Sequence, residues 1–259
     1  MLDRHLCLLL LLTACGPTQS RPPDAGLDGG STDAGTPVDA GATPDSGTMV
    51  DAGSAVDAGR AVTTANLLAL TQNCVPASSV RYATDVGLPP AISICTLDGA
   101  FFWKADLDVD CDGKVSAQCS LATDPAFQDQ TSLTDSRNAP LDAASLPYVV
   151  VPLPSSQPGG FDYQAAGIHL GAVALVIFNG QLAWGIFGDE GPEDIIGEAS
   201  YAMAQSLGID PNPSTGGHDG VDVTYLVFTG ASAVVATPED HAAAVTLGQS
   251  LAAQVLAHN

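Results

Sequence analysis

Basic residues are scarce in this chain of 259 residues, which has seven Lys and Arg against 29 Asp and Glu and a formal net charge of −22. Nucleic acids are bound through Lys and Arg gathered on one surface, and so few basic residues cannot form such a surface. We therefore expect no nucleic-acid partner. The excess of carboxylates would instead attract a polycation, although negative charge also serves solubility alone.

Long apolar runs are also missing, since residues 173–178 form only a strand-sized run and no later segment could span a membrane. The first fourteen residues combine Arg4 with a short apolar core, which is typical of an export signal. They end at Thr13-Ala14-Cys15, which resembles the cleavage box of bacterial lipoproteins; an ordinary signal peptide is the alternative. The resemblance implies a lipid on Cys15, so an N-terminal lipid anchor would be the protein's only membrane contact.

Aromatic residues are absent between Gly16 and Arg60, where Asp-Ala-Gly recurs among Pro, Thr and Ser. Such a segment buries too little apolar area to fold, so it predicts a disordered, charged linker. We expect a signal peptide at residues 1–14, the linker at residues 15–60 and one folded, monomeric domain at residues 61–259. The signal peptide predicts an exported protein, and Gly16 follows Cys15 where an inner-membrane retention signal would have Asp. The protein would be lipid-anchored to a bacterial outer membrane or cell surface, or released from it.

Motifs for cysteine-bound metals and for serine hydrolases are missing, because neither Cys-x-x-Cys nor Gly-x-Ser-x-Gly occurs. Four cysteines fall in the predicted domain, and an even number in an exported chain indicates two disulfides. Three pairings of the four are open. Proximity in the sequence favours Cys74 with Cys95 and Cys111 with Cys119.

Turn signals and apolar patterns predict a β-rich α+β fold. Asn179-Gly180 between two apolar runs predicts a type I′ hairpin. A helix is expected from Pro192 to about Leu207, where Gly208 ends it, and another from Pro238 to about Ala257. We expect an antiparallel, barrel-like core, with a double-psi barrel as one option, and the helices packed outside it.

Acidic residues alternate with apolar ones at the end of a predicted strand. Asp106, Asp108 and Asp110 therefore share one face of that strand. The spacing Asp108-x-Asp110-x-Asp112-Gly113 also matches the opening of a calcium loop, but Cys119 stands where the closing acid belongs. A solvated face and a ligand-facing row are the other interpretations.

Five carboxylates lie between Gly188 and Tyr201 with no basic residue among them. Such a cluster cannot easily ionise all its members, so at least one pKa should rise. Most glycoside hydrolases use a protonated carboxylic acid beside an ionised one as their two catalytic groups. A solvated acidic loop is the alternative interpretation.

Several motifs in this order resemble the fungal-type chitosanases of glycoside hydrolase family 75, over about Cys74 to Gly230. They are the acidic stretch from Ala105 to Gly113, Thr123-Asp124-Pro125-Ala126-Phe127-Gln128, Pro140-Leu141-Asp142, Leu146 to Pro152, Phe187-Gly188-Asp189-x-Gly191-Pro192, Ile196 to Tyr201, and Gly220 with Thr224 to Phe228.

The resemblance implies an endo-acting, inverting hydrolase of β-1,4 bonds in chitosan or chito-oligosaccharides. It places the catalytic pair at Asp189, as general base, and Glu198, as general acid. We expect Asp106, Asp108 and Asp110 to face the substrate amines, with Tyr148 and Tyr201 as further substrate contacts. No metal and no cofactor are expected.

Two other functions stay open at this point. One is a non-catalytic acidic surface protein that binds polycationic glycans or calcium. The other is a glycosidase that acts on another polymer, such as β-glucan or peptidoglycan.

Overall fold

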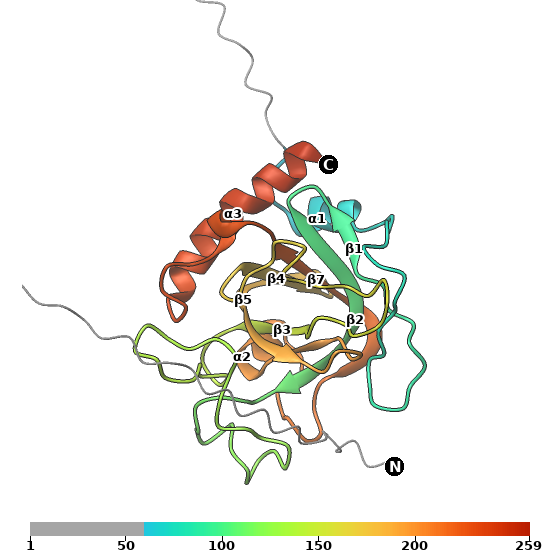
Figure 1. The fold of residues 1–259 in the computed structure, drawn as a ribbon. Helices are drawn as coiled ribbons and strands as arrows, with labels where there is room; N and C mark the ends of the chain where they lie inside the picture. Colours follow the sequence, from blue (N-terminus) through green and yellow to red (C-terminus); the bar gives the residue numbers. More distant parts are fainter. Residues whose placement is uncertain (1–59) are drawn as a thin grey trace, which may run out of the picture. The chain divides into compact units, whose positions relative to one another are not determined.

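Six strands close into a barrel in residues 60–259, the part of the chain that the computed structural model describes (Figure 1). The predictions for the signal peptide, for Cys15 and for nearly all of the linker lie outside the described residues. Around the barrel the order is β2, β6, β3, β5, β4, β7 and again β2, and β1 pairs with β2 as a seventh strand. The strands are β1 (Cys95–Leu97), β2 (Ala100–Asp110), β3 (Tyr148–Pro152), β4 (Val173–Phe178), β5 (Gln181–Gly191), β6 (Glu198–Ser200) and β7 (His218–Phe228).

The barrel is mixed, which corrects the expectation of an antiparallel one. β2 runs parallel to β6, and β3 runs parallel to β5, whereas the other pairs are antiparallel. The reason is that β6 follows β5 after a short connection but inserts between β2 and β3 instead of pairing with β5. The double-psi option stays a prediction.

The barrel interior is filled by side chains that alternate along the strands. Trp103, Ala105 and Leu107 of β2 belong to one buried cluster with residues from the five other barrel strands. Trp103 stacks on Tyr225 with ring centroids 5.4 Å apart. Since these alternate residues face inward, the acids between and after them face the outer wall of the barrel.

The helices of the described residues lie outside the barrel, as expected; they are α1 (Thr64–Leu70), α2 (Tyr201–Ser206) and α3 (His241–His258). α3 packs against β4 and β5. A Cβ on Gly248 would lie 2.4 Å from the Trp184 ring, so a glycine there lets the helix approach β5 closely. α3 begins at His241 with Asp240 as its N-cap, three residues later than predicted.

The hairpin prediction is confirmed, since Asn179 and Gly180 have φ of 46° and 78° and join β4 to β5. Both positive angles are those of a type I′ turn. The predicted disulfide pairing is also found, because Cys74 bonds Cys95 and Cys111 bonds Cys119. Within residues 60–259, no helix has both the length and the apolar character needed to cross a membrane.

The helix predicted from Pro192 is wrong over most of its length. α2 starts only at Tyr201, and Ser200 caps it by accepting a hydrogen bond from Met203 N at 3.2 Å. Gly197 has φ of +117°, which no helix accommodates. The three residues from Glu198 to Ser200 instead extend the sheet as β6, paired with β2. Glu198 therefore lies on a strand and not on a helix face.

Candidate active site

A pocket lies on the outer wall of the barrel where β2, β6, β3 and β5 run side by side. Four acids on the strands line it, and the loop between β2 and β3 adds two acids and an amide. Its lining residues are Val109, Asp110, Cys111, Asp112, Asp124, Ala126, Gln128, Val150, Asp189, Glu190, Gly191, Pro192 and Glu198. Both predicted catalytic residues, Asp189 and Glu198, thus line the same pocket.

β3 lies between the strands that carry these two carboxylates. Val149 of β3 pairs with Ala199 on one side and with Phe187 on the other, and Val150 pairs with Asp189. Neighbouring strands are about 4.8 Å apart, so two strands on either side of a third are separated by roughly 10 Å. The sheet therefore sets Asp189 and Glu198 across Val150, with a gap between their carboxyl groups.

The carboxyl group of Glu198 is half-buried in acidic surroundings. Burial, together with the neighbouring charges of Asp110, Asp108, Asp189 and Asp85, raises its pKa to about 8. A Cβ on Gly191 would lie 2.8 Å from Glu198 Oε2, so glycine at this position leaves room for the carboxyl group. At neutral pH this group holds a proton that it can donate.

Asp189 is buried, with 7% of its surface exposed, but hydrogen-bond donors surround one of its carboxylate oxygens. Its Oδ1 accepts hydrogen bonds from Ser132 N at 2.8 Å, Ser132 Oγ at 2.7 Å and Glu190 N at 2.8 Å. Burial raises the pKa of Asp189 above its usual value, and these three donors, which stabilise the ionised form, limit that rise. All three bonds end on Oδ1, so Oδ2 carries none of them.

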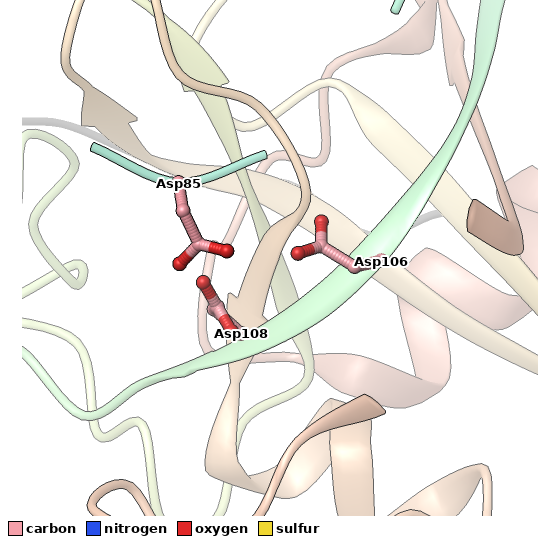
Figure 2. A group of neighbouring side chains, drawn as sticks. All are labelled: Asp85, Asp106 and Asp108. Atoms are coloured by element: carbon pink, nitrogen blue, oxygen red, sulfur yellow. The ribbon is translucent and has the colours of Figure 1, made fainter. Parts of the chain in front are cut away.

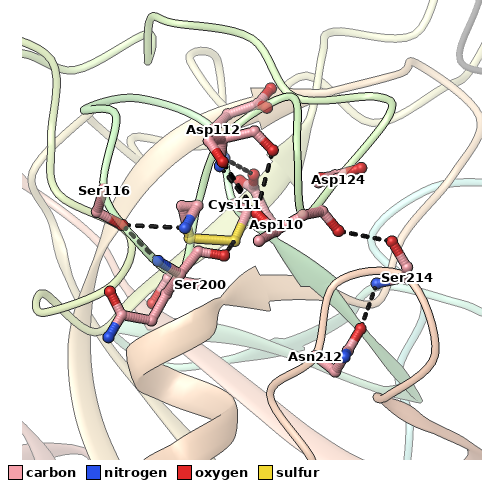
Figure 3. Close-up of a disulfide and its surroundings, with 12 residues drawn as sticks. Asp110, Cys111, Asp112, Ser116, Asp124, Ser200, Asn212 and Ser214 are labelled. Carbon is pink, nitrogen blue, oxygen red and sulfur yellow. Dashed lines mark hydrogen bonds between the residues drawn. A yellow bond between two sulfur atoms is a disulfide. The ribbon is translucent and has the colours of Figure 1, made fainter.

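Asp110 and Asp112 form a linked pair at the end of β2, next to the Cys111–Cys119 disulfide (Figure 3). Asp112 N donates to Asp110 Oδ1 at 2.7 Å, and Gln128 N donates to Asp112 Oδ1 at 2.7 Å. Burial raises the pKa of Asp112 to about 7 and raises that of Asp110 well above its usual range, and the charge of Asp189 adds to both. The disulfide fixes the chain directly between these two acids.

The three acids predicted to face the substrate divide into two groups. Asp110 lines the pocket, whereas Asp106 and Asp108 lie outside its lining and form a cluster with Asp85. Asp108 is nevertheless the β2 partner of Glu198, so the cluster borders the pocket.

The two predicted aromatic contacts lie outside the pocket lining. Tyr148 is fully buried, and its hydroxyl donates to the carbonyl of Asp112 at 3.1 Å. We therefore expect Tyr148 to support the acidic wall from below rather than to touch a sugar. Tyr201 is partly buried at the start of α2 and packs against the buried apolar cluster that includes Tyr148.

Sequence reasoning missed several residues of the pocket wall. Asp124 and Gln128 come from the loop between β2 and β3, and they and Asp112 fell within motifs of the family resemblance without being assigned to the site. Ser132, which holds Asp189, has no distinguishing signal in the sequence. Glu190 lines the pocket and accepts a hydrogen bond from Tyr163 Oη, whereas Glu193 is exposed and bonded to Ser156.

Comparison with known proteins identifies the family. Residues 107–253 match the family described as "Fungal chitosanase of glycosyl hydrolase group 75". The chain belongs to this family. The match includes Asp108, Asp110, Asp189 and Glu198, and so covers the whole pocket.

Three fungal relatives show the extent of the similarity. The chain is 37% identical over 140 residues to endo-chitosanase C of Aspergillus oryzae, over 52% of this chain and 33% of the relative. It is 36% identical over 152 residues to endo-chitosanase B of the same species, over 54% and 63%. It is 34% identical over 164 residues to an endo-chitosanase of Aspergillus fumigatus, over 60% and 65%. The matched regions thus span between a third and just under two thirds of the length of these relatives.

Proposed function

We propose that this protein is an endo-chitosanase that cuts β-1,4 bonds between glucosamine units with inversion. The observation that carries the proposal is the placement of Asp189 and Glu198 on either side of β3 in one acidic pocket. Membership of the family and the names of its fungal relatives support the choice of substrate.

Glu198 is the general acid in this proposal. Its raised pKa of about 8 keeps it protonated at neutral pH, so it can protonate the leaving glycosidic oxygen. Asp189 is the general base, because its three donors favour the carboxylate that must take a proton from water. Inverting glycosidases separate the two carboxyl groups by roughly 6.5–9.5 Å to admit that water. Two strand spacings, roughly 10 Å between the backbones, lie close to the upper end of this range.

The pocket wall supports a cationic substrate. Asp110, Asp112 and Asp124 line it together with the catalytic pair, and the lining contains no Lys, Arg or His. Chitosan carries protonated amines that such a wall attracts, whereas a neutral glucan gains nothing from it. We propose Asp110 as an amine-facing residue. Asp106 and Asp108 keep that role only as a prediction for a neighbouring subsite.

The test measures reducing ends released from soluble chitosan by the full chain, with carboxymethyl cellulose as the comparison polymer. Asp189→Asn and Glu198→Gln should each lower kcat by about 10²–10⁴-fold while chitosan binding persists. Glu193→Gln, at an exposed acid next to the pocket strands, is the matched control and should keep wild-type turnover. Wild-type turnover in both pocket variants would refute the assignment.

Two further measurements separate the remaining alternatives. Binding of chitosan without any release of reducing ends by the wild-type protein would favour a non-catalytic glycan-binding protein. NMR of the first product anomer tests inversion, which requires the α-anomer to appear first.

Export and lipid anchoring at Cys15 are a separate proposal, supported by the pattern of the first fifteen residues alone. Cys15→Ser should abolish labelling by a radioactive fatty acid in a bacterial host and leave the protein unattached to membranes. Equal labelling of the variant would contradict this proposal.

A further inference from the structure

Three carboxylates gather beside the pocket without lining it: Asp85, Asp106 and Asp108 (Figure 2). Each offers one oxygen, and these oxygens all lie within 4.8 Å of one another. Asp106 and Asp108 project from β2, while Asp85 belongs to the loop that follows Tyr82 and Ala83. Residues about twenty positions apart in the sequence thus bring three carboxyl groups together.

Asp106 is the member that points to a ligand. Only 3% of its surface is exposed, and its Oδ1 has no hydrogen-bond partner among the described residues. Figure 2 shows its carboxyl group directed toward those of Asp85 and Asp108. A buried carboxylate oxygen without a partner is unfavourable unless a donor or a metal ion compensates it.

The backbone around Asp106 leaves room for its carboxyl group. A Cβ on Gly197 would lie 2.1 Å from Asp106 Oδ1, a distance that no side chain tolerates. Gly197 also has φ of +117°, which L-residues rarely adopt. The local fold thus accommodates the buried acid.

We propose that Asp85, Asp106 and Asp108 bind a divalent cation of the calcium class. Calcium takes carboxylate oxygens at 2.3–2.6 Å, so two oxygens on opposite sides of one ion are about 4.8 Å apart. Three oxygens within that distance of one another can therefore share one ion. All three ligands are hard oxygen donors, which excludes the softer metals that prefer Cys or His.

A compact ion fits this cluster better than the amine of a sugar. Asp106 is almost completely buried, so a bare ion reaches it more readily than a ligand that carries a pyranose ring.

The cation would fasten a loop to the strand beside Glu198. Ala83 N donates to the carbonyl of Asp194 at 2.9 Å, and Ile196 N donates to the carbonyl of Ala83 at 3.0 Å. The loop carrying Asp85 is thus already tied to the chain that enters β6. A bound ion would add a link from this loop to β2, whose Asp108 pairs with Glu198.

The proposed cation site does not depend on the proposed function. Nothing in the sequence links Asp85 to the acids of β2. Sequence analysis therefore predicts no metal site here. The family match begins at residue 107 and covers only Asp108 of the three ligands. We therefore infer the site from the arrangement of this chain alone.

The experiment is calorimetric titration of the full chain with calcium chloride, after chelator treatment and dialysis, at constant ionic strength. The wild-type protein should bind one calcium ion saturably and show a higher Tm with calcium. Asp85→Asn and Asp106→Asn should each weaken binding by at least about tenfold, because each removes one charged ligand. Magnesium should bind more weakly, since its shorter bonds require closer oxygens.

Two matched control variants and a Tm measurement with glucosamine complete the test. Asp98→Asn, at an exposed acid on the turn between β1 and β2, should keep wild-type affinity, and so should Asp112→Asn in the pocket. No saturable calcium binding by the wild-type protein overturns the proposal, whatever happens to the variants. Unchanged affinity in Asp85→Asn, or affinity lost in Asp112→Asn instead, also overturns it. A Tm rise with glucosamine but none with calcium would do the same.

Discussion

At the residue scale, the site depends on how differently two carboxyl groups are surrounded. Glu198 sits among acids, whereas Asp189 receives three hydrogen bonds on one oxygen. The clustering of acids was visible in the sequence and predicted a raised pKa. The donors to Asp189 were not, because Ser132 lies 57 positions away and belongs to an irregular loop. Contacts of this kind follow from tertiary structure alone.

Asp110 should control the alkaline limit of activity through Glu198. Its charge is the largest electrostatic contribution to the raised pKa of Glu198, after burial. In Asp110→Asn the pKa of Glu198 should fall, so the general acid loses its proton at lower pH. The alkaline limb of the kcat–pH profile should therefore move to lower pH relative to the wild-type protein. A limb that stays in place, or moves to higher pH, would contradict Glu198 as the general acid.

The matched control for this profile is Glu193→Gln, which removes an exposed charge bonded to Ser156. Its profile should coincide with that of the wild-type protein. Because chitosan amines titrate identically in all three measurements, a difference between variants reports on the protein.

At the scale of elements, short sequence motifs predicted the structures that depend on neighbouring residues alone. The Asn179-Gly180 hairpin was predictable because two positive φ angles favour those two residues. The helix expected from Pro192 failed because β6 pairs with β2, whose residues lie ninety positions earlier in the sequence. The same long-range pairing places Glu198 on a strand. The parallel pairs of the barrel were unpredictable for this reason too.

The two disulfides should differ in their effect on activity. Cys111–Cys119 adjoins Asp110 and Asp112, whereas Cys74–Cys95 ties the preceding segment to β1, which pairs with the first residues of β2. Loss of either should cost roughly 2–3 kcal/mol of unfolding free energy, as expected for closed loops of this size. Replacing Cys111 and Cys119 by Ser should also lower kcat, even when kcat is measured well below the unfolding temperature of the variant.

The variant with Ser at Cys74 and Cys95 is the comparison for that experiment. It should keep wild-type kcat under the same conditions, despite a similar loss in urea-unfolding measurements. Equal kcat losses in both variants would show that the disulfide at the pocket has no special positioning role.

At the scale of the whole molecule, buried acids should make the protein more stable in mildly acidic solution. Folding raises the pKa of Glu198 to about 8 and of Asp112 to about 7, from 4.5 and 3.8. Between the unfolded and folded values, the folded state binds more protons, so the free energy of unfolding falls as pH rises. The decrease should run from about pH 4 to about pH 9, because burial also raises the pKa of Asp106 to about 9.

Urea unfolding between pH 5 and pH 8, with a chelator present, measures this slope. In Glu198→Gln the slope should become shallower, because one of the responsible groups no longer titrates. Asp135 has a lowered pKa and contributes stability that is lost only as pH falls below its unfolded value, so it does not oppose the trend in this range. Stability that rises from pH 5 to pH 8 would contradict the buried-acid account.

The position of β3 between the two carboxylates that we propose as catalytic has a consequence for how this fold diversifies. Their separation rests on hydrogen bonds between strands, which changes of side chain elsewhere hardly alter. The loop between β2 and β3 contributes Asp124 and Gln128 to the same pocket and no barrel strand. Related proteins can therefore differ in the loop between β2 and β3, and so in the polymer they prefer, while Asp189 and Glu198 keep their relative positions.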